Sequence, residues 1–375
     1  MTEYGKLNIY NTDWEKIAYI DSYTSLIWTR RFTTYGDFEL YLPWKPSLND
    51  IIKPDYYVEL DGDPDLKGIW NDEIYAMIIE RIEYVQETGQ PTMMIVKGRC
   101  LESLLYRRVF YQDIVLSDST TGYSLSCKYN YLEYIIRNCM GADAVPARRI
   151  PYAIFNVDIP MPQYDDSRVR TVNKNDNLGE SLTELLCAWG YGILVTYNIS
   201  DRKLYIRLSN HNDRTSGENA LIFRSDLDNL ANCHYIKDIS GMDNVCRISS
   251  NQATATYPPG QNFDTATFQG IMRREVAFTT DLLGDATGTY QALQASGQRQ
   301  IRSYYTTEEI TAEIITSAEM DYKPGDLALI ETDFGVMAQA WITEVTQSFS
   351  TEGYTKYPVF GTFKTLEDVR KNGEE

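Results

Sequence analysis

A short pattern occurs twice in the chain, as Ala76-Met77-Ile78-Ile79-Glu80 and as Ala340-Trp341-Ile342-Thr343-Glu344. A Lys-Pro pair precedes each copy, Lys53-Pro54 or Lys323-Pro324, and a glycine follows each glutamate after nine residues. The two copies lie much farther apart than the ~20–50 residues of a solenoid repeat. The pattern therefore predicts a β-domain that is present twice in one chain.

The two copies differ in one spacing. The distance from Lys-Pro to the alanine is six residues longer in the first copy, and a longer hairpin loop over residues 61–70 accounts for this difference. We therefore expect residues 53–98 and 323–361 to form the same β-substructure.

Length and charge limit the function. A chain of 375 residues exceeds the ~250–300 at which a single core stops growing, so two or more domains are expected. The 53 acidic and 35 basic residues leave a net charge of −18, which argues against binding of nucleic acid through its phosphates and against anionic membranes. No stretch approaches the ~20 apolar residues of a membrane span, so no membrane-spanning segment is expected.

Hydrophobic periodicity predicts a mainly β fold with an α+β middle. Residues 25–31 and 38–42 alternate between apolar and polar side chains, and Tyr35-Gly36-Asp37 provides the turn between them. In the middle of the chain Asn177 is expected to cap a helix, and a hairpin is expected over residues 193–208.

These patterns divide the chain into four parts. We expect a first β-domain over residues 1–112 and a mixed α/β region over residues 113–240, part of which completes the first β-domain. A second β-domain is expected over residues 241–370, with an extended arm at 250–300, followed by a charged tail at 371–375.

No catalytic motif is present. The chain has no HExxH, GxSxG, P-loop or GxGxxG sequence, and its two histidines, His211 and His234, have no neighbouring ligand set. The stretch at residues 61–65 resembles a calcium loop, but Leu66 stands where that loop needs glycine, so a hairpin tip is favoured. We therefore expect no catalytic residues, no metal and no cofactor, and the chain is predicted not to be an enzyme.

Cysteines and arginines leave alternatives open. The six cysteines lack CxxC spacing and are interpreted as reduced thiols made in a cytosol, with disulfides as the alternative. Four arginine doublets occur in this acidic chain, and each fits either an ion pair within the chain or a contact between subunits. The candidates for subunit contacts are Trp28, Arg30, Arg31, Phe38, Arg107, Arg108, Arg273 and Arg274.

Several motifs resemble those of siphophage tail-hub proteins. The opening Ser25-Leu-Ile-Trp-Thr-Arg-Arg-Phe-Thr-Thr-Tyr-Gly-Asp-Phe-Glu-Leu-Tyr-Leu-Pro43 is similar to the two opening strands of that family. Val96-Lys-Gly-Arg-Cys-Leu-Glu-Ser-Leu-Leu-Tyr-Arg-Arg108 resembles its strand-to-helix step. Further matches follow in the family's order at Asp228-Asn-Leu230, Asn244-Val245, Tyr322-Lys-Pro-Gly-Asp326 and Trp341-Ile-Thr-Glu-Val345.

The resemblance implies two tail-tube-like β-barrel domains plus a mixed insert, a fold related to myophage baseplate hubs. It implies a trimeric ring at the distal end of a phage tail, which joins the six-fold tube or distal tail protein to the three-fold tip. DNA then passes through an acidic channel without specific binding. Further partners implied are the C-terminus of the tape-measure protein and a tail fibre or spike protein, in a virion whose proteins are made in the bacterial cytoplasm.

Two other functions remain open. A receptor-binding spike is expected to carry a fibrous repeat, a coiled-coil stalk or a distal lectin-like domain, and a tail-borne cell-wall hydrolase usually carries an appended catalytic domain. Neither feature is found in the sequence. A structural hub is therefore the favoured interpretation.

Overall fold

The computed structural model describes residues 5–61, 72–111, 114–116, 128–150, 153–156, 170–250, 253–260, 267–279, 290, 293–294, 297, 307–313, 321–351 and 353–361. Contacts divide the chain into two compact units. We call residues 1–233 with 312–375 the sheet unit and residues 234–311 the insert unit.

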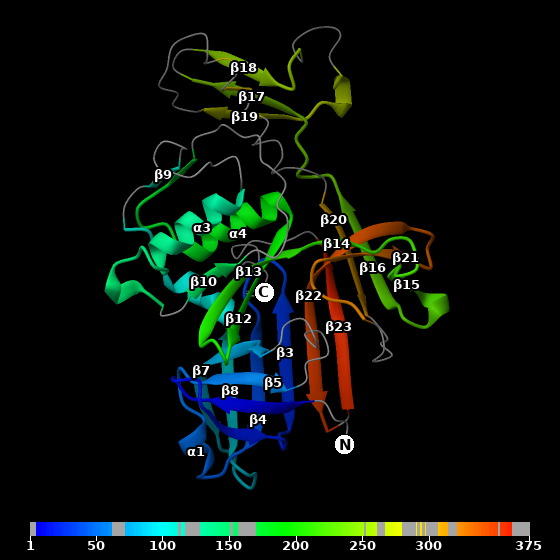
Figure 1. The fold of residues 1–375 in the computed structure, drawn as a ribbon. Helices are drawn as coiled ribbons and strands as arrows, with labels where there is room; N and C mark the ends of the chain where they lie inside the picture. Colours follow the sequence, from blue (N-terminus) through cyan, green and yellow to red (C-terminus); the bar gives the residue numbers. More distant parts are fainter. Residues whose placement is uncertain are drawn as a thin grey trace. The chain divides into compact units, whose positions relative to one another are not determined.

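The sheet unit is mainly β, as predicted (Figure 1). Its largest sheet has twelve strands in the order β14-β21-β22-β3-β4-β8-β7-β5-β1-β2, with β15 beside β21 and β23 beside β22. These strands are β1 (Lys6–Tyr10), β2 (Lys16–Ile20), β3 (Ser25–Arg31), β4 (Asp37–Pro43), β5 (Tyr57–Asp61), β7 (Ala76–Val85), β8 (Met93–Cys100), β14 (Asn212–Asp213), β15 (Ile222–Arg224), β21 (Asp326–Glu331), β22 (Met337–Ser350) and β23 (Gly353–Gly361).

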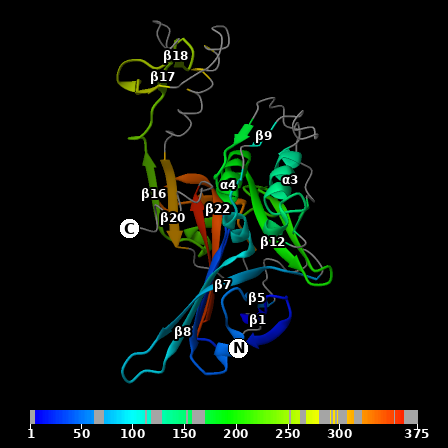
Figure 2. The same cartoon turned by 90° about the vertical axis from the view of Figure 1, so that its left-hand side faces the viewer.

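Alternation of side chains explains how this sheet builds its core. In β4 and β8 every second residue is buried, because successive side chains of a strand point to opposite faces. The buried set fills one hydrophobic cluster, which includes Trp28, Phe38, Leu40, Met94 and Val96. Figure 2 shows β7 and β8 running side by side, and their pairing is antiparallel.

Both copies of the sequence pattern build the same antiparallel motif of three strands. In the first copy β7 pairs with β5 and β8, and in the second copy β22 pairs with β21 and β23. The strand order and pairing of the two copies agree, and superposition of residues 53–98 on residues 323–361 stays a prediction. The two copies nevertheless lie in one sheet, joined through β3 and β4, and among the described strands this sheet does not close into a barrel.

The two Lys-Pro pairs begin the copies with the same turn. Asp55 and Gly325 both have positive φ, 64° and 95°. The next amide donates back to the carbonyl of Lys53 or Lys323, at 3.2 Å in each copy, as in a type II turn. The amide of Asp55 donates to Ile79 O and that of Gly325 to Ile342 O, both at 2.8 Å. Each turn therefore attaches to the central strand of its own copy.

A smaller sheet and two helices complete the sheet unit. The order is β10-β13-β12-β6, and α3 and α4 share one hydrophobic core with β12 and β13 (Figure 1). Asn177 caps α4 as predicted, because its side chain accepts the amides of Gly179 and Glu180. The elements are β6 (Glu73–Ile74), β10 (Ala153–Asn156), β12 (Tyr191–Asn198), β13 (Lys203–Asn210), α3 (Lys128–Cys139) and α4 (Leu178–Trp189).

The remaining elements are short. The sheet unit has α1 (Leu48–Ile51), the 3₁₀ helices η1 (Leu101–Arg107), η2 (Pro146–Arg148) and η3 (Ser225–Leu227), and the paired strands β9 (Ile114–Leu116) and β11 (Arg170–Val172). The paired strands β16 (Ala231–Asp238) and β20 (Thr307–Glu313) contain the boundaries between the units. The insert unit has β17 (Val245–Ser249), β18 (Thr254–Tyr257), β19 (Glu275–Thr279) and η4 (Gly270–Met272).

The insert unit contains a sheet of three strands in the order β18-β17-β19. Residues 250–300, predicted as an extended arm, provide β18 and β19 of this sheet. The tail predicted at 371–375 lies outside the described residues. The domain boundaries expected from the sequence stay a prediction, because the two compact units do not test them. These expected domains are 1–112, 113–240 and 241–370.

Trp14 connects the first hairpin to both sheets. Its indole is stacked between Tyr57 of β5 and Tyr197 of β12, with ring centroids 3.8 and 3.7 Å apart and interplanar angles of 9° and 7°. The backbone of Trp14 has φ 63°, a conformation that costs a non-glycine residue free energy. The two stacking contacts offset this cost.

We expect Trp14→Ala to lower the free energy of unfolding by about 2–3 kcal/mol, because both stacking contacts are lost while the unfavourable φ remains. Urea denaturation followed by circular dichroism measures this change. Trp14→Phe is the matched control and keeps part of the stack, so its loss is smaller. Equal stability of the wild type and Trp14→Ala would contradict the role of the stack.

Candidate functional site

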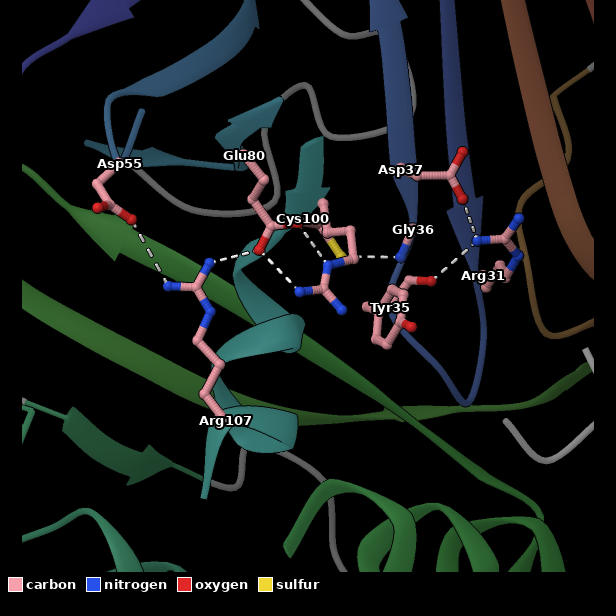
Figure 3. A network of polar contacts seen from close by, with 9 residues as sticks. Arg31, Tyr35, Gly36, Asp37, Asp55, Glu80, Cys100 and Arg107 are labelled. Atoms are coloured by element: carbon pink, nitrogen blue, oxygen red, sulfur yellow. Dashed lines mark hydrogen bonds and ion pairs between the residues drawn. The ribbon is translucent and has the colours of Figure 1, made fainter. Parts of the chain in front are cut away.

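A connected set of arginines and carboxylates crosses the large sheet between β22 and η1. Figure 3 shows its part from Arg31 to Arg107. We call it the arginine–carboxylate network, and its members are Arg31, Asp37, Asp55, Glu80, Arg99, Arg107 and Glu344.

Glu80 holds two arginines in the first copy. The pairing of β7 with β8 shifts register between Ile79 and Arg81, so Glu80 occupies a β-bulge. Its carboxylate accepts Arg99 Nε at 2.6 Å and Nη2 at 2.8 Å, and it also accepts Arg107 Nη2 at 2.5 Å. The fork of Arg99 thus ties β8 to β7, and Arg107 ties η1 to the same strand.

Glu344 has the corresponding role in the second copy. The pairing of β22 with β23 also shifts register, between Ile342 and Glu344. Glu344 lies opposite Arg31 of β3 and accepts its Nε at 2.5 Å. Arg31 also donates to Asp37 and to the carbonyl of Tyr35, the latter at 3.1 Å. The glutamate that ends each sequence pattern therefore binds an arginine of the neighbouring strand.

Tyr35 and Asp37 join the two halves of the network. The Arg99 guanidinium lies over the Tyr35 ring, 4.9 Å from its centroid, and Asp37 is the register partner of Arg99 across β4 and β8. Between them the amide of Gly36 donates to Cys100 Sγ at 2.8 Å. A Cβ on Gly36 would lie 2.1 Å from the carbonyl oxygen of Thr29, so this close approach requires glycine.

Burial and ion pairing have opposite effects on these groups. Burial alone would raise the pKa of Glu80, but the hydrogen bonds from Arg99 and Arg107 outweigh it and lower the pKa. Burial favours loss of the proton from Arg31, whereas Glu344 and Asp37 retain it and raise the pKa of Arg31. Glu80 and Arg31 are therefore charged at neutral pH, and Glu80 loses its stabilising contribution as the pH falls through its lowered pKa.

Glu102 of η1 is a second buried carboxyl near the network. Its side chain is almost fully enclosed, Oε1 accepts the amide of Val195 in β12 at 2.9 Å, and Oε2 has no hydrogen-bond partner in the described part of the chain. Burial raises the pKa of Glu102 above its ordinary value, more than the contacts with Cys100 and Val195 lower it. Glu102 thus joins the two sheets while favouring its neutral form.

The structure divides the residues predicted at subunit contacts. Arg31 and Arg107 belong to the network, while Trp28 and Phe38 lie in the hydrophobic core with ring centroids 5.9 Å apart. The side chains of Trp28 and Phe38 are enclosed by their own chain, so any effect on a subunit contact is indirect. Arg30 lies buried with its guanidinium over Tyr75, 5.3 Å from the ring centroid.

The other predicted residues lie elsewhere. Arg108 follows η1 and donates to the carbonyl of Arg107 at 3.1 Å. Arg273 pairs with Glu275 at 2.5 Å, and Arg274 donates to the carbonyl of Ile239 at 2.8 Å, all within the insert unit. Arg148 donates to the carbonyl of Val109 and Arg149 to that of Ala144, so all four doublets have partners within the chain, and a role of these arginines between subunits stays a prediction.

Sequence reasoning missed the carboxylates Glu80, Asp37 and Glu344. A signal was present for two of them, because Glu80 and Glu344 end the repeated pattern at the same position. The arginine doublets pointed to charged contacts but not to the partners, since Arg31 and Glu344 are 313 residues apart in sequence.

The network positions strands and provides no reactive group. Arg31, Arg99 and Arg107 all form ion pairs with carboxylates of the network. These ion pairs hold neighbouring strands and η1 in position. Among the described residues no group of three or more His, Cys, Asp or Glu side chains is arranged for a metal ion. Within the same residues no helix is long and apolar enough to cross a membrane. The loop at 62–71, part of the calcium-like stretch, lies outside them.

Three solved structures share this fold at low sequence identity. They are a tail protein from Neisseria meningitidis MC58 (13% identity, TM-score 0.54, 97% of this chain and 99% of that chain), the 43 kDa tail protein of prophage MuSo2 from Shewanella oneidensis (14%, 0.55, 96% and 98%) and prophage tail protein gp18 from Listeria monocytogenes EGD-e (10%, 0.53, 99% and 98%). The fold is therefore that of phage tail proteins.

The sequence matches the siphovirus ReqiPepy6 Gp37-like protein family over residues 6–362, and the chain belongs to that family. The predicted resemblance to siphophage tail proteins is thereby confirmed. No curated protein is significantly similar to the chain.

We expect Glu80→Gln to lower the free energy of unfolding by about 1–3 kcal/mol, because Arg99 and Arg107 then lack their shared counter-charge. Chemical denaturation at pH 7 measures this change. The control is Glu83→Gln, which breaks only the exposed pair with Arg81 and should cost less than about 0.5 kcal/mol. Equal losses in the two variants would contradict the special role of Glu80.

We expect the stability of the wild type to respond to pH through Glu102. Because folding raises its pKa, Glu102 stabilises the fold while both states are protonated, and this contribution is lost as the pH rises from about 4.5 through the raised pKa. Glu102→Gln does not titrate and keeps an acceptor for the Val195 amide. The stability of Glu102→Gln relative to the wild type should therefore increase over that pH interval, which denaturation midpoints of both proteins measure. If the two midpoints instead changed with pH in parallel, Glu102 would play no part.

Proposed function

We propose that the chain is a structural tail protein that forms a trimeric ring at the distal end of a siphophage tail. The ring joins the six-fold tube or distal tail protein to the three-fold tip and contacts the C-terminus of the tape-measure protein and a fibre or spike protein. The observation that carries this proposal is the pair of matched three-strand motifs, β5-β7-β8 and β21-β22-β23.

Symmetry connects this observation to the function. A trimer of a chain with two similar motifs presents six similar positions, which match the six subunits of a tube ring. In this proposal each motif belongs to one of two tail-tube-like β-barrel domains of the chain. The network supports it, because the glutamates at the same position of the two copies are both ion-paired: Glu80 joins β7 to β8 of the first motif, and Glu344 joins β22 of the second motif to β3.

The charge fits passage of DNA. A ring with a net charge of −18 per chain repels the phosphate backbone, so an acidic channel lets DNA leave without binding it. The function is non-enzymatic and the protein acts in the virion, after synthesis in the cytoplasm of the bacterial host. Ion pairing in the network supports a mechanical role, since its groups are engaged with one another.

Imaging of purified tails tests the proposal. A phage that encodes this chain with a small electron-dense or antibody-binding tag should show three tags at the distal tail tip, and a phage without the chain should form no complete tip. Tags along the tube, on the capsid or in another number would overturn the ring. Binding of the purified protein to host cells, with no tag in the tail ring, would favour a receptor-binding spike.

A further inference from the structure

The most exposed apolar side chains among the described residues lie together in the insert unit. Ile271 and Met272 form η4 with Gly270, and their exposed fractions are 97% and 69%. Ile239 is 44% exposed, and its carbonyl accepts a hydrogen bond from Arg274, which follows the tip in the sequence. We call Ile271 with Met272 the apolar tip.

The apolar tip has a firmly hydrogen-bonded base. Asn244 donates Nδ2 to Met272 O at 2.7 Å and accepts the amide of Arg274 on Oδ1 at 2.8 Å. The amides of Asn244 and Val245 donate to Arg274 O at 3.0 and 2.9 Å. The side chain of Asn244 and the backbone amides of Asn244 and Val245 thus hold the end of the tip and Arg274. The tip is therefore presented to solvent in an ordered conformation, which lowers the entropy cost of binding.

Positive charge lies beside the apolar tip. Arg273 is balanced by Glu275 at 2.5 Å. Arg274 donates to the carbonyl of Ile239 and makes no ion pair with a described residue, so its charge is available to a partner. An apolar anchor next to an arginine is the composition that dominates the binding energy of many protein interfaces.

The two units differ strongly in charge. Residues 234–311 contain six basic and eight acidic side chains, compared with 35 and 53 in the whole chain. Almost all of the net charge of −18 therefore belongs to the sheet unit. A surface of the sheet unit complements an apolar tip that carries Arg274, because opposite potentials attract and steer association.

We propose that the apolar tip of one copy docks onto the acidic surface of the sheet unit of a second copy. This inference rests on the proposed function, because such docking is a contact between neighbouring chains of the ring. Ile271 and Met272 supply the buried anchor, and Arg274 supplies the orienting charge.

Sedimentation velocity of the full chain over a range of protein concentrations tests the docking. The double variant Ile271→Ser/Met272→Ser should weaken self-association at least about tenfold, as expected on loss of a buried anchor. The control is Ile236→Ser, which removes an exposed apolar side chain, 39% exposed, from the insert unit outside the apolar tip and should leave association unchanged. Circular dichroism verifies that both variants are folded.

Salt dependence tests the charge. Rising ionic strength should weaken association of the wild type, and Arg274→Gln should reduce that dependence, because the variant has no charge to screen. A wild type that remains monomeric at every concentration, or a double variant that associates like the wild type, overturns the docking. Imaging of the tagged tails distinguishes the two proposals. Three tags at the tail tip, together with a double variant that self-associates like the wild type, would refute only the docking. Tags elsewhere on the particle would refute the ring.

Discussion

The ion pairs of Glu80 and Glu344 are the interaction on which the large sheet depends. Bulges are irregular positions where a strand would otherwise lose pairing, and in this chain Glu80 lies on one and Glu344 lies next to another. The arginine partners come from adjacent strands and from η1. Glu80 binds Arg99 across its own bulge, while Glu344 binds Arg31 of β3 on the regularly paired side of β22, both with charge-assisted hydrogen bonds. The sheet accordingly continues through both places.

A second level of order comes from groups that join the two sheets. Glu102 receives an amide of β12, and Trp14 stacks on β5 and β12 together. Within the smaller sheet, Glu73 of β6 and Arg207 of β13 form a buried ion pair with an N–O distance of 2.6 Å. The contacts of Glu102 and Trp14 are polar or aromatic and therefore directional, so they define the relative orientation of the sheets more closely than apolar packing alone would.

Local elements of the fold were predictable from sequence, and long-range pairing was not. The alternation over residues 38–42 and the cap at Asn177 act within a few residues, and both appear in the structure as expected. The pairing of β3 with β22 joins residues more than 300 positions apart, and no local pattern encodes it. For the same reason only part of the arginine–carboxylate network could be predicted. The doublet that contains Arg31 indicated a charged contact, but its partner Glu344 becomes a neighbour of Arg31 only after folding.

The two Lys-Pro turns are alike in hydrogen bonding but differ in what surrounds them. Asp55 reaches Arg107, at 3.9 Å, while a Cβ on Gly325 would lie 2.3 Å from the ring of Phe32. An exchange of these two residues would therefore remove a contact from one copy and crowd the other. The two copies therefore differ in their surroundings. In the ring of three chains proposed above, two kinds of corner would alternate, and a neighbour that makes three contacts could recognise every second corner.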